Sequence, residues 1–150
     1  MEFQTVRDVL SFAISLEHIS QEFYQELADE VTDSGVRSFL LEMVQQEALH
    51  EQQLRDLLED GGAHLLGTVD DSEIHSYIQA MQVPDELDYK KAVKVAFDKE
   101  NASQMLYTIL SNMIQSDEAI RKLLLDLAKQ EKIHKEFFAK EYDRIRLSEN

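Results

Sequence analysis

The chain has 150 residues, of which 43% are hydrophobic, enough for one ordinary globular domain with a substantial core. Its 15 basic and 30 acidic residues give a formal net charge of -15, which argues against a nucleic-acid binder and against docking to an anionic membrane surface. Because the chain has no cysteine, it has no disulfide, thiolate metal site, iron–sulfur cluster or catalytic thiol. The opening residues are mixed and acidic, and no apolar run approaches the roughly 18 residues of a membrane span, so we expect a single cytoplasmic domain over residues 1–150.

Four long helices are expected, because the few residues that break helices gather in two places. Gly35 lies in the first half of the chain, and Gly61, Gly62, Gly67 and Pro84 lie between the two halves. The rest of the sequence is rich in Leu, Glu, Ala, Gln and Lys, which favour helix. The pattern predicts helices at about 5–32, 35–60, 88–115 and 117–146.

The connections between these helices predict two hairpins. Ser34, Asp88 and Ser116 are the expected N-caps of the last three helices. Short turns join the first helix to the second and the third to the fourth, so each pair is expected to be an antiparallel hairpin. A long crossover at about 61–87, with a short helix near 72–81, connects the hairpins.

Each predicted helix carries one glutamate near the middle of an otherwise apolar stripe. The four glutamates are Glu17, Glu47, Glu100 and Glu131. A buried carboxylate is costly unless it is paired, protonated or bound to a metal. Four of them at similar depth would gather four negative charges, which indicates a site for cations.

An internal repeat relates the two halves of the chain. Five residues of the first helix recur 83 positions later: Ala13, Glu17, Ser20, Tyr24 and Leu27 match Ala96, Glu100, Ser103, Tyr107 and Leu110. The segments 40–50 and 124–134 match at an offset of 84, and each contains one of the two Glu-x-x-His strings of the chain, Glu47/His50 and Glu131/His134. Positions i and i+3 lie on one helix face, so each string can present a carboxylate and an imidazole together.

This set of side chains suits a pair of divalent cations. Carboxylate and imidazole ligands favour iron or manganese over metals that prefer sulfur. One glutamate from each of two helices, with Glu-x-x-His from each of the other two, is the ligand pattern of di-metal carboxylate bundles. The sequence therefore predicts two iron ions as cofactors, with manganese as the alternative.

Four segments carry a resemblance to a known family, the rubrerythrin-like branch of the ferritin-like superfamily. They are Glu17–Tyr24, Gln46–His50, Glu100–Tyr107 and Gln130–His134. The resemblance implies an all-α fold, a ferritin-like four-helix bundle of two antiparallel helical hairpins joined by a long crossover.

The resemblance also implies roles for the site residues. The metal ligands would be Glu17, Glu47, His50, Glu100, Glu131 and His134. Of these, Glu17 and Glu100 would be terminal ligands, Glu47 and Glu131 would bridge the two metals, and each metal would take one histidine. Tyr24 and Tyr107 would hydrogen-bond the ligands and fix their orientation.

Two departures from rubrerythrins affect the expected activity. Rubrerythrins carry a cysteine-ligated rubredoxin domain, whereas this chain has no cysteine. They also carry an additional glutamate on the third helix, and Ser103 occupies that position here. An external electron donor, rubredoxin-like or a flavoprotein, would therefore be required.

The leading functional hypothesis is a di-iron oxidoreductase that reduces peroxide or dioxygen. The alternatives are a ferroxidase that handles iron, a non-enzymatic iron-binding or iron-sensing bundle, and a purely structural bundle. A second apolar stripe, formed by Phe12, Leu16, Ile19 and Phe23, either widens the core or forms a dimer face, and we favour a homodimer.

Overall fold

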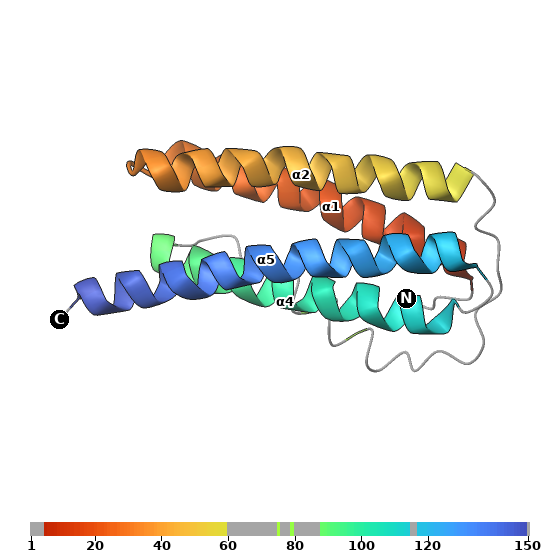
Figure 1. Cartoon of the computed structure of the whole chain (residues 1–150). Coiled ribbons are helices and arrows are strands. Elements are labelled where there is room, and N and C mark those ends of the chain that lie inside the picture. Colours follow the sequence, from red (N-terminus) through yellow and green to blue (C-terminus); the bar gives the residue numbers. More distant parts are fainter. Residues whose placement is uncertain (1–4, 60–74, 76–78, 80–87, 115–116, 150) are drawn as a thin grey trace. The chain divides into compact units, whose positions relative to one another are not determined.

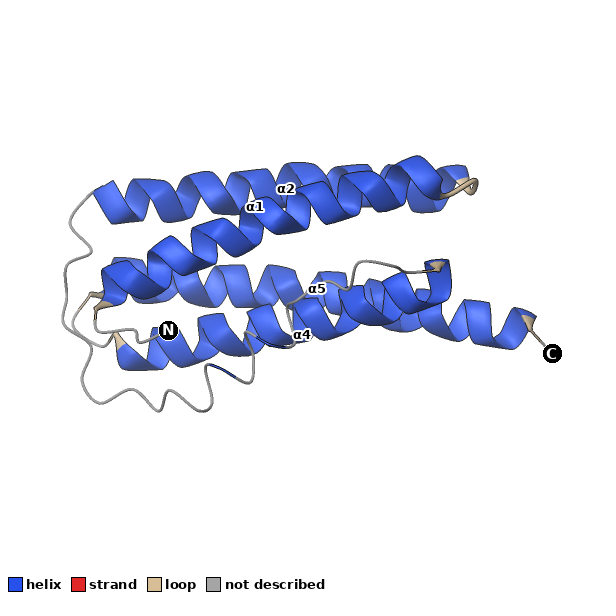
Figure 2. Cartoon of the chain, turned by 180° about the vertical axis from the view of Figure 1, so that it is seen from behind, coloured by secondary structure: helices blue, strands red, loops and turns tan. Residues whose placement is uncertain are grey.

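The computed structural model describes residues 5–59, 75, 79, 88–114 and 117–149. Four long helices account for most of this part of the chain, and Figure 2 shows helices and turns but no strand in it. Their bounds are α1 (Val6–Glu30), α2 (Ser34–Glu59), α4 (Tyr89–Met113) and α5 (Glu118–Ser148). The predicted all-α class is confirmed, and each helix end lies within one or two residues of its expected place.

The helices form two compact units, each an antiparallel hairpin (Figure 1). In the first hairpin α1 packs along α2, and in the second hairpin α4 packs along α5. The predicted crossover at 61–87, with its short helix near 72–81, lies outside the described residues apart from His75 and Gln79. The single domain of residues 1–150 stays a prediction.

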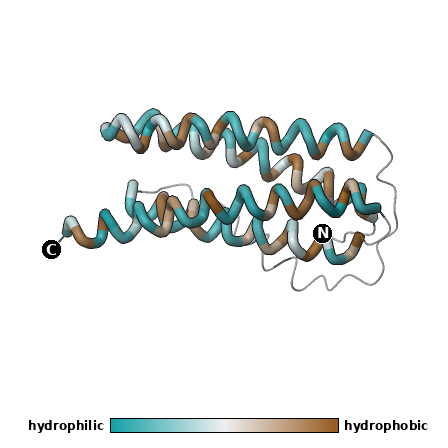
Figure 3. The backbone as a smooth tube through the Cα atoms, viewed as in Figure 1, coloured by the Kyte–Doolittle hydropathy of each residue, from teal (hydrophilic) through white to brown (hydrophobic). Residues whose placement is uncertain are grey.

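The helices are amphipathic, as the stripes in the sequence require. Figure 3 shows hydrophobic and hydrophilic residues interleaved along each of the four helices. In the first hairpin, the buried apolar residues include Leu10, Ala13, Leu27, Leu40, Met43 and Leu54. In the second hairpin, they include Val93, Ala96, Leu110, Leu124, Leu127 and Phe138. Burial of these stripes is the main stabilising contribution to such helices.

Two of the predicted N-caps are wrong by one residue. Ser34 is the first residue of α2, and Asp33 is the cap, since its Oδ1 accepts a hydrogen bond from the Val36 backbone N–H at 2.9 Å. Asp117, not Ser116, caps α5, accepting from the N–H groups of Ala119 and Ile120. In both cases a carboxylate takes the position next to the positive helix end, where a negative charge is favoured.

The other two helix starts use the same chemistry. Asp88 caps α4 as predicted, with its Oδ1 2.8 Å from the Lys91 backbone nitrogen. Thr5 and Asp8 form a reciprocal capping box at α1, in which each side chain accepts from the other residue's backbone N–H. Among the described helices, none has both the length and the apolar character needed to cross a bilayer.

Candidate metal centre

The first hairpin brings together three potential metal ligands, which we call the first half-site: Glu17, Glu47 and His50. Glu17 lies in the middle of α1, while Glu47 and His50 are one turn apart on α2 and share a face of that helix. His50 Nδ1 lies 3.6 Å from Glu17 Oε2 and 3.7 Å from Glu47 Oε2. One ligand atom from each residue lies within 4.8 Å of those of the other two.

The first half-site is buried, and its electrostatics favour a cation. Glu17 is 3% exposed, Glu47 is 1% exposed and His50 is fully buried. Burial raises the pKa of Glu17 well above its usual range, the Glu47 carboxylate raises it further, and His50 opposes them. A divalent cation would offset the same repulsion without protonating the carboxylates.

The second hairpin repeats this arrangement, and we call Glu100, Glu131 and His134 the second half-site. Glu100 lies in α4, and Glu131 and His134 lie one turn apart on α5. His134 Nδ1 is 3.6 Å from Glu100 Oε2 and 3.9 Å from Glu131 Oε2, and all three residues are buried. The distances therefore reproduce those of the first half-site to within a few tenths of an ångström.

The donor set of each half-site fits a metal ion. Oxygen and imidazole nitrogen ligands lie about 2.0–2.2 Å from a bound divalent metal, so two donors to one ion lie up to about 4 Å apart. The measured carboxylate–imidazole separations of 3.6 to 3.9 Å fall within this range. Each hairpin thus presents two carboxylates and one imidazole at a spacing that one ion can span.

Four other polar residues share helix faces with the glutamates. Tyr24 and Ser20 are buried on α1, and Tyr107 and Ser103 are buried at the repeat-related places on α4. Ser20 Oγ donates to the Leu16 carbonyl oxygen of its own helix at 2.9 Å. Hydrogen bonding of the metal ligands by Tyr24 and Tyr107 stays a prediction.

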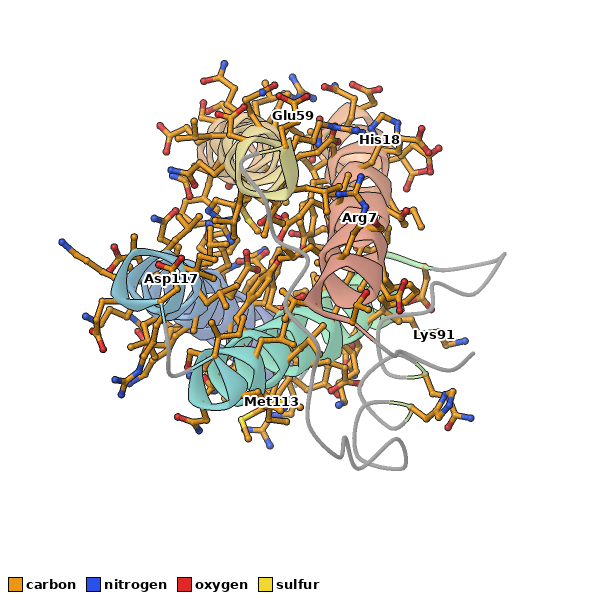
Figure 4. The ribbon with its side chains drawn as sticks, turned by 90° about the vertical axis from the view of Figure 1, so that its right-hand side faces the viewer. Arg7, His18, Glu59, Lys91, Met113 and Asp117 are labelled. Atoms are coloured by element: carbon orange, nitrogen blue, oxygen red, sulfur yellow. The ribbon has the colours of Figure 1, made fainter. Side chains whose placement is uncertain are left out.

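Two charged features beside the half-sites were not anticipated from the sequence. Glu51, which follows His50, accepts from Gln21 Nε2 and Arg55 Nε, and its Oε1 lies 3.1 Å from His18 Nδ1. His18 itself is exposed on α1 (Figure 4). Lys99, which precedes Glu100, is 1% exposed. A comparison of the two repeats position by position would have singled out Glu51, whose matching residue is Lys135, but not the burial of Lys99.

Comparisons with known proteins agree with this arrangement. Residues 5–73 match the family model described as Ferritin-like domain, and residues 91–150 match the one described as Rubrerythrin. The first match spans α1 and α2 completely, and the second spans α5 and all but the first two residues of α4, so each contains one half-site. No curated protein matches the chain significantly.

Two solved structures resemble the whole chain. A Thermotoga maritima protein described as a ferritin-like diiron-carboxylate protein shares 23% identity and a TM-score of 0.76, over 95% of this chain and 98% of that one. A hypothetical protein from Pyrococcus furiosus shares 21% identity and a TM-score of 0.72, over 93% of this chain and 89% of that one. These likenesses establish a ferritin-like fold.

Proposed function

Because the chain is a ferritin-like protein of rubrerythrin-like type, we propose that its two half-sites together bind two iron ions and that the protein reduces peroxide or dioxygen. One observation carries the proposal. Each hairpin buries two carboxylates and an imidazole whose ligand atoms lie within 4.8 Å of one another. Four carboxylates would balance the charge of two divalent cations.

In this proposal each ligand has a distinct role. Glu17 and Glu100 would each hold one metal as terminal ligands, and Glu47 and Glu131 would be shared by both, as the family resemblance implies. His50 and His134 provide one neutral imidazole per metal. Manganese is the alternative cofactor, since the same ligands accept it.

Bound iron would supply the redox chemistry of the reaction by cycling between the ferrous and ferric states. The ligands themselves hold charge and exclude water, because all six are at most 3% exposed. Tyr24 and Tyr107 are proposed to orient the carboxylates through their hydroxyl groups. No protein nucleophile is needed.

The reaction requires electrons from outside these 150 residues. Reduction of one peroxide to two waters consumes two electrons and two protons, which corresponds to two ferrous ions becoming ferric. The chain has no cysteine, so a cysteine-ligated iron centre within it cannot return those electrons. We propose a rubredoxin-like protein or a flavoprotein as the donor.

The test is turnover by protein loaded anaerobically with ferrous iron. Peroxide or dioxygen is added with a supplied reductant, and the consumption of both is followed. Multiple turnovers that are lost in Glu131→Gln support an oxidoreductase. Consumption of excess ferrous iron with release or storage of ferric product, without use of the reductant, indicates a ferroxidase instead. Tightly bound iron with neither activity leaves an iron-binding or sensing bundle.

We also propose a cytoplasmic homodimer. Ile19, one residue of the second apolar stripe, is 45% exposed, whereas Phe23 in the same stripe is buried. Light scattering on the purified protein gives the mass in solution directly. A dimer that dissociates in Ile19→Glu supports this face as the interface.

A further inference from the structure

We infer that the two half-sites bind divalent cations with unequal affinity, the first half-site more tightly than the second. This inference rests on the proposed function, since it requires each half-site to bind metal. The ligands of the two half-sites are the same, but the charged residues that flank them differ.

The clearest difference is a pair of residues that occupies the same place in both hairpins. In the first hairpin, His18 Nδ1 lies 3.1 Å from Glu51 Oε1. The repeat offsets place Asn101 and Lys135 at the matching positions of the second hairpin, and Lys135 Nζ donates to Asn101 Oδ1 at 3.3 Å. Glu51 directly follows the ligand His50, and Lys135 directly follows the ligand His134. A carboxylate next to one histidine is thus replaced by an ammonium next to the other.

Lys99 is a second lysine that lies next in sequence to a ligand of the second half-site. It directly precedes Glu100 and is 1% exposed, whereas the matching residue of the first hairpin is the apolar Leu16. A buried charge acts through a low dielectric and is weakly screened by salt. Lys132, which follows Glu131, is exposed and contributes less.

The same asymmetry extends over the two halves of the sequence. Residues 1–69 contain 14 acidic and 3 basic residues, none of them lysine. Residues 70–150 contain 16 acidic and 12 basic residues, including all nine lysines. The field of the first hairpin therefore attracts cations more strongly than that of the second.

These charges set the order in which the half-sites fill. One unit charge about 10 Å from a divalent ion changes its affinity on the order of tenfold or more at the effective dielectric of a protein surface. We expect the first half-site to fill first, and the ion at the second half-site to be the more readily exchanged.

The experiment is an anaerobic titration of the full-length, metal-free protein with Mn²⁺ alone, in which free Mn²⁺ is followed by electron paramagnetic resonance. The expected result is two ions per chain in two steps, with dissociation constants that differ on the order of tenfold. Glu17→Gln should abolish the tight step. Its repeat-matched control, Glu100→Gln, should abolish the weak step and keep the tight one.

Variants of residues that are not ligands test the cause. Lys99→Leu and Lys135→Glu each introduce the residue found at the matching place in the first hairpin. Each should tighten the weak step several-fold and bring the two dissociation constants closer. Lys91→Glu changes the net charge as much as Lys135→Glu but lies nine positions before Glu100, and it should leave the ratio of the constants unchanged.

The outcomes separate this inference from the proposed function. Two equal steps in the wild-type protein, or a tight step lost in Glu100→Gln rather than in Glu17→Gln, would overturn the inference and leave a two-metal site intact. Fewer than two ions per folded chain would overturn the proposed function itself. If circular dichroism shows that either Gln variant is unfolded, the inference is tested by the Lys99 and Lys135 variants, since neither residue is a ligand. Unchanged dissociation constants in both of these variants would overturn it.

Discussion

At Glu17, burial raises the pKa of the side chain, the neighbouring Glu47 carboxylate raises it further, and the His50 imidazole offsets only part of the effect. In the metal-free protein the ionised form of Glu17 is therefore unfavourable relative to the unfolded chain. A bound divalent cation would reverse the balance, because it favours the ionised carboxylate. Loss of the Glu17 charge should thus weaken metal binding and stabilise the metal-free protein.

The stability of the metal-free protein should depend on pH through Glu17. Between the raised pKa of Glu17 in the folded protein and its ordinary value of 4.5, the folded protein binds a proton at Glu17 and the unfolded chain does not. The contribution of Glu17 to the free energy of unfolding therefore rises as the pH falls through this range. Glu17→Gln lacks this component, and at neutral pH the metal-free variant should be more stable than the metal-free wild type. Urea unfolding of both metal-free proteins from pH 4.5 to 7.5 measures the difference. A difference that does not change with pH would contradict the assignment.

Removal of Glu131 should lower the metal content per chain without unfolding the protein. Glu131→Ala deletes a buried carboxylate that lies in the second half-site on α5. The helix itself should persist, because alanine is the best helix former. Elemental analysis and circular dichroism measure the two properties separately. Glu136→Ala, which changes an exposed residue of the same helix, is the control. Full metal occupancy in Glu131→Ala would refute the role of Glu131 as a ligand.

At the scale of the elements, the helix starts depend on single side chains. Three aspartates, Asp33, Asp88 and Asp117, accept hydrogen bonds from backbone N–H groups that α2, α4 and α5 would otherwise leave unsatisfied. The same residues place a negative charge at the positive end of each helix dipole. These aspartates therefore help to set the residue at which α2, α4 and α5 each begin.

The cap of α2 can be tested by a pair of adjacent substitutions. Asp33→Ala removes the acceptor of the Val36 N–H and should lower the free energy of unfolding by about 1 kcal/mol. Ser34→Ala, at the first helical residue, should change it by less than half as much. Chemical denaturation of the two variants distinguishes them, and the opposite order would restore Ser34 as the cap.

A polar cluster joins α4 to α5 near the start of α4. The Tyr89 hydroxyl donates to Glu141 Oε1 at 2.8 Å, and Arg144 Nε donates to Glu141 Oε2 at 2.9 Å. The repeat-matched residues in the first hairpin are the apolar Val6 and Leu57. Burial and the hydrogen bond to Glu141 raise the pKa of Tyr89 above its ordinary value of 10.0.

This cluster should make the protein sensitive to alkaline pH. The pKa of Tyr89 is higher in the folded protein than in the unfolded chain. The contribution of Tyr89 to stability is therefore fully present below pH 10, and it is lost above pH 10 because the unfolded chain then releases the tyrosine proton more readily. Tyr89→Phe should lower the free energy of unfolding at neutral pH by about 1 kcal/mol and should weaken its decline above pH 10. Unfolding curves from pH 8 to 11 test this, with Tyr142→Phe as a control. An unchanged alkaline decline in Tyr89→Phe would contradict the account.

At the scale of the whole molecule, the repeat explains how much could be predicted from the sequence. Helical periodicity and the matching Glu-x-x-His strings predicted four helices and the residues that gather in each hairpin. They could not separate Ser34 from Asp33 as a cap, since both residue types cap helices and the two are adjacent. They also missed the Tyr89–Glu141 contact, which joins residues 52 positions apart and has no counterpart in the first hairpin.

Lys99 illustrates a different limit of prediction from the sequence. Lysine is almost never fully buried, so a sequence pattern assigns it to the surface by default. Here it is 1% exposed and precedes a candidate metal ligand. Only the structure shows that this lysine is buried, and its apolar repeat partner Leu16 gives no indication of a polar role.

The proposed function requires the six buried ligands of the two hairpins to bind two metal ions. The most direct measurement is the metal content per chain by elemental analysis, after anaerobic loading with ferrous iron and removal of loosely bound ions. The account predicts about two irons per chain. A value near zero in protein with full helix content would contradict it.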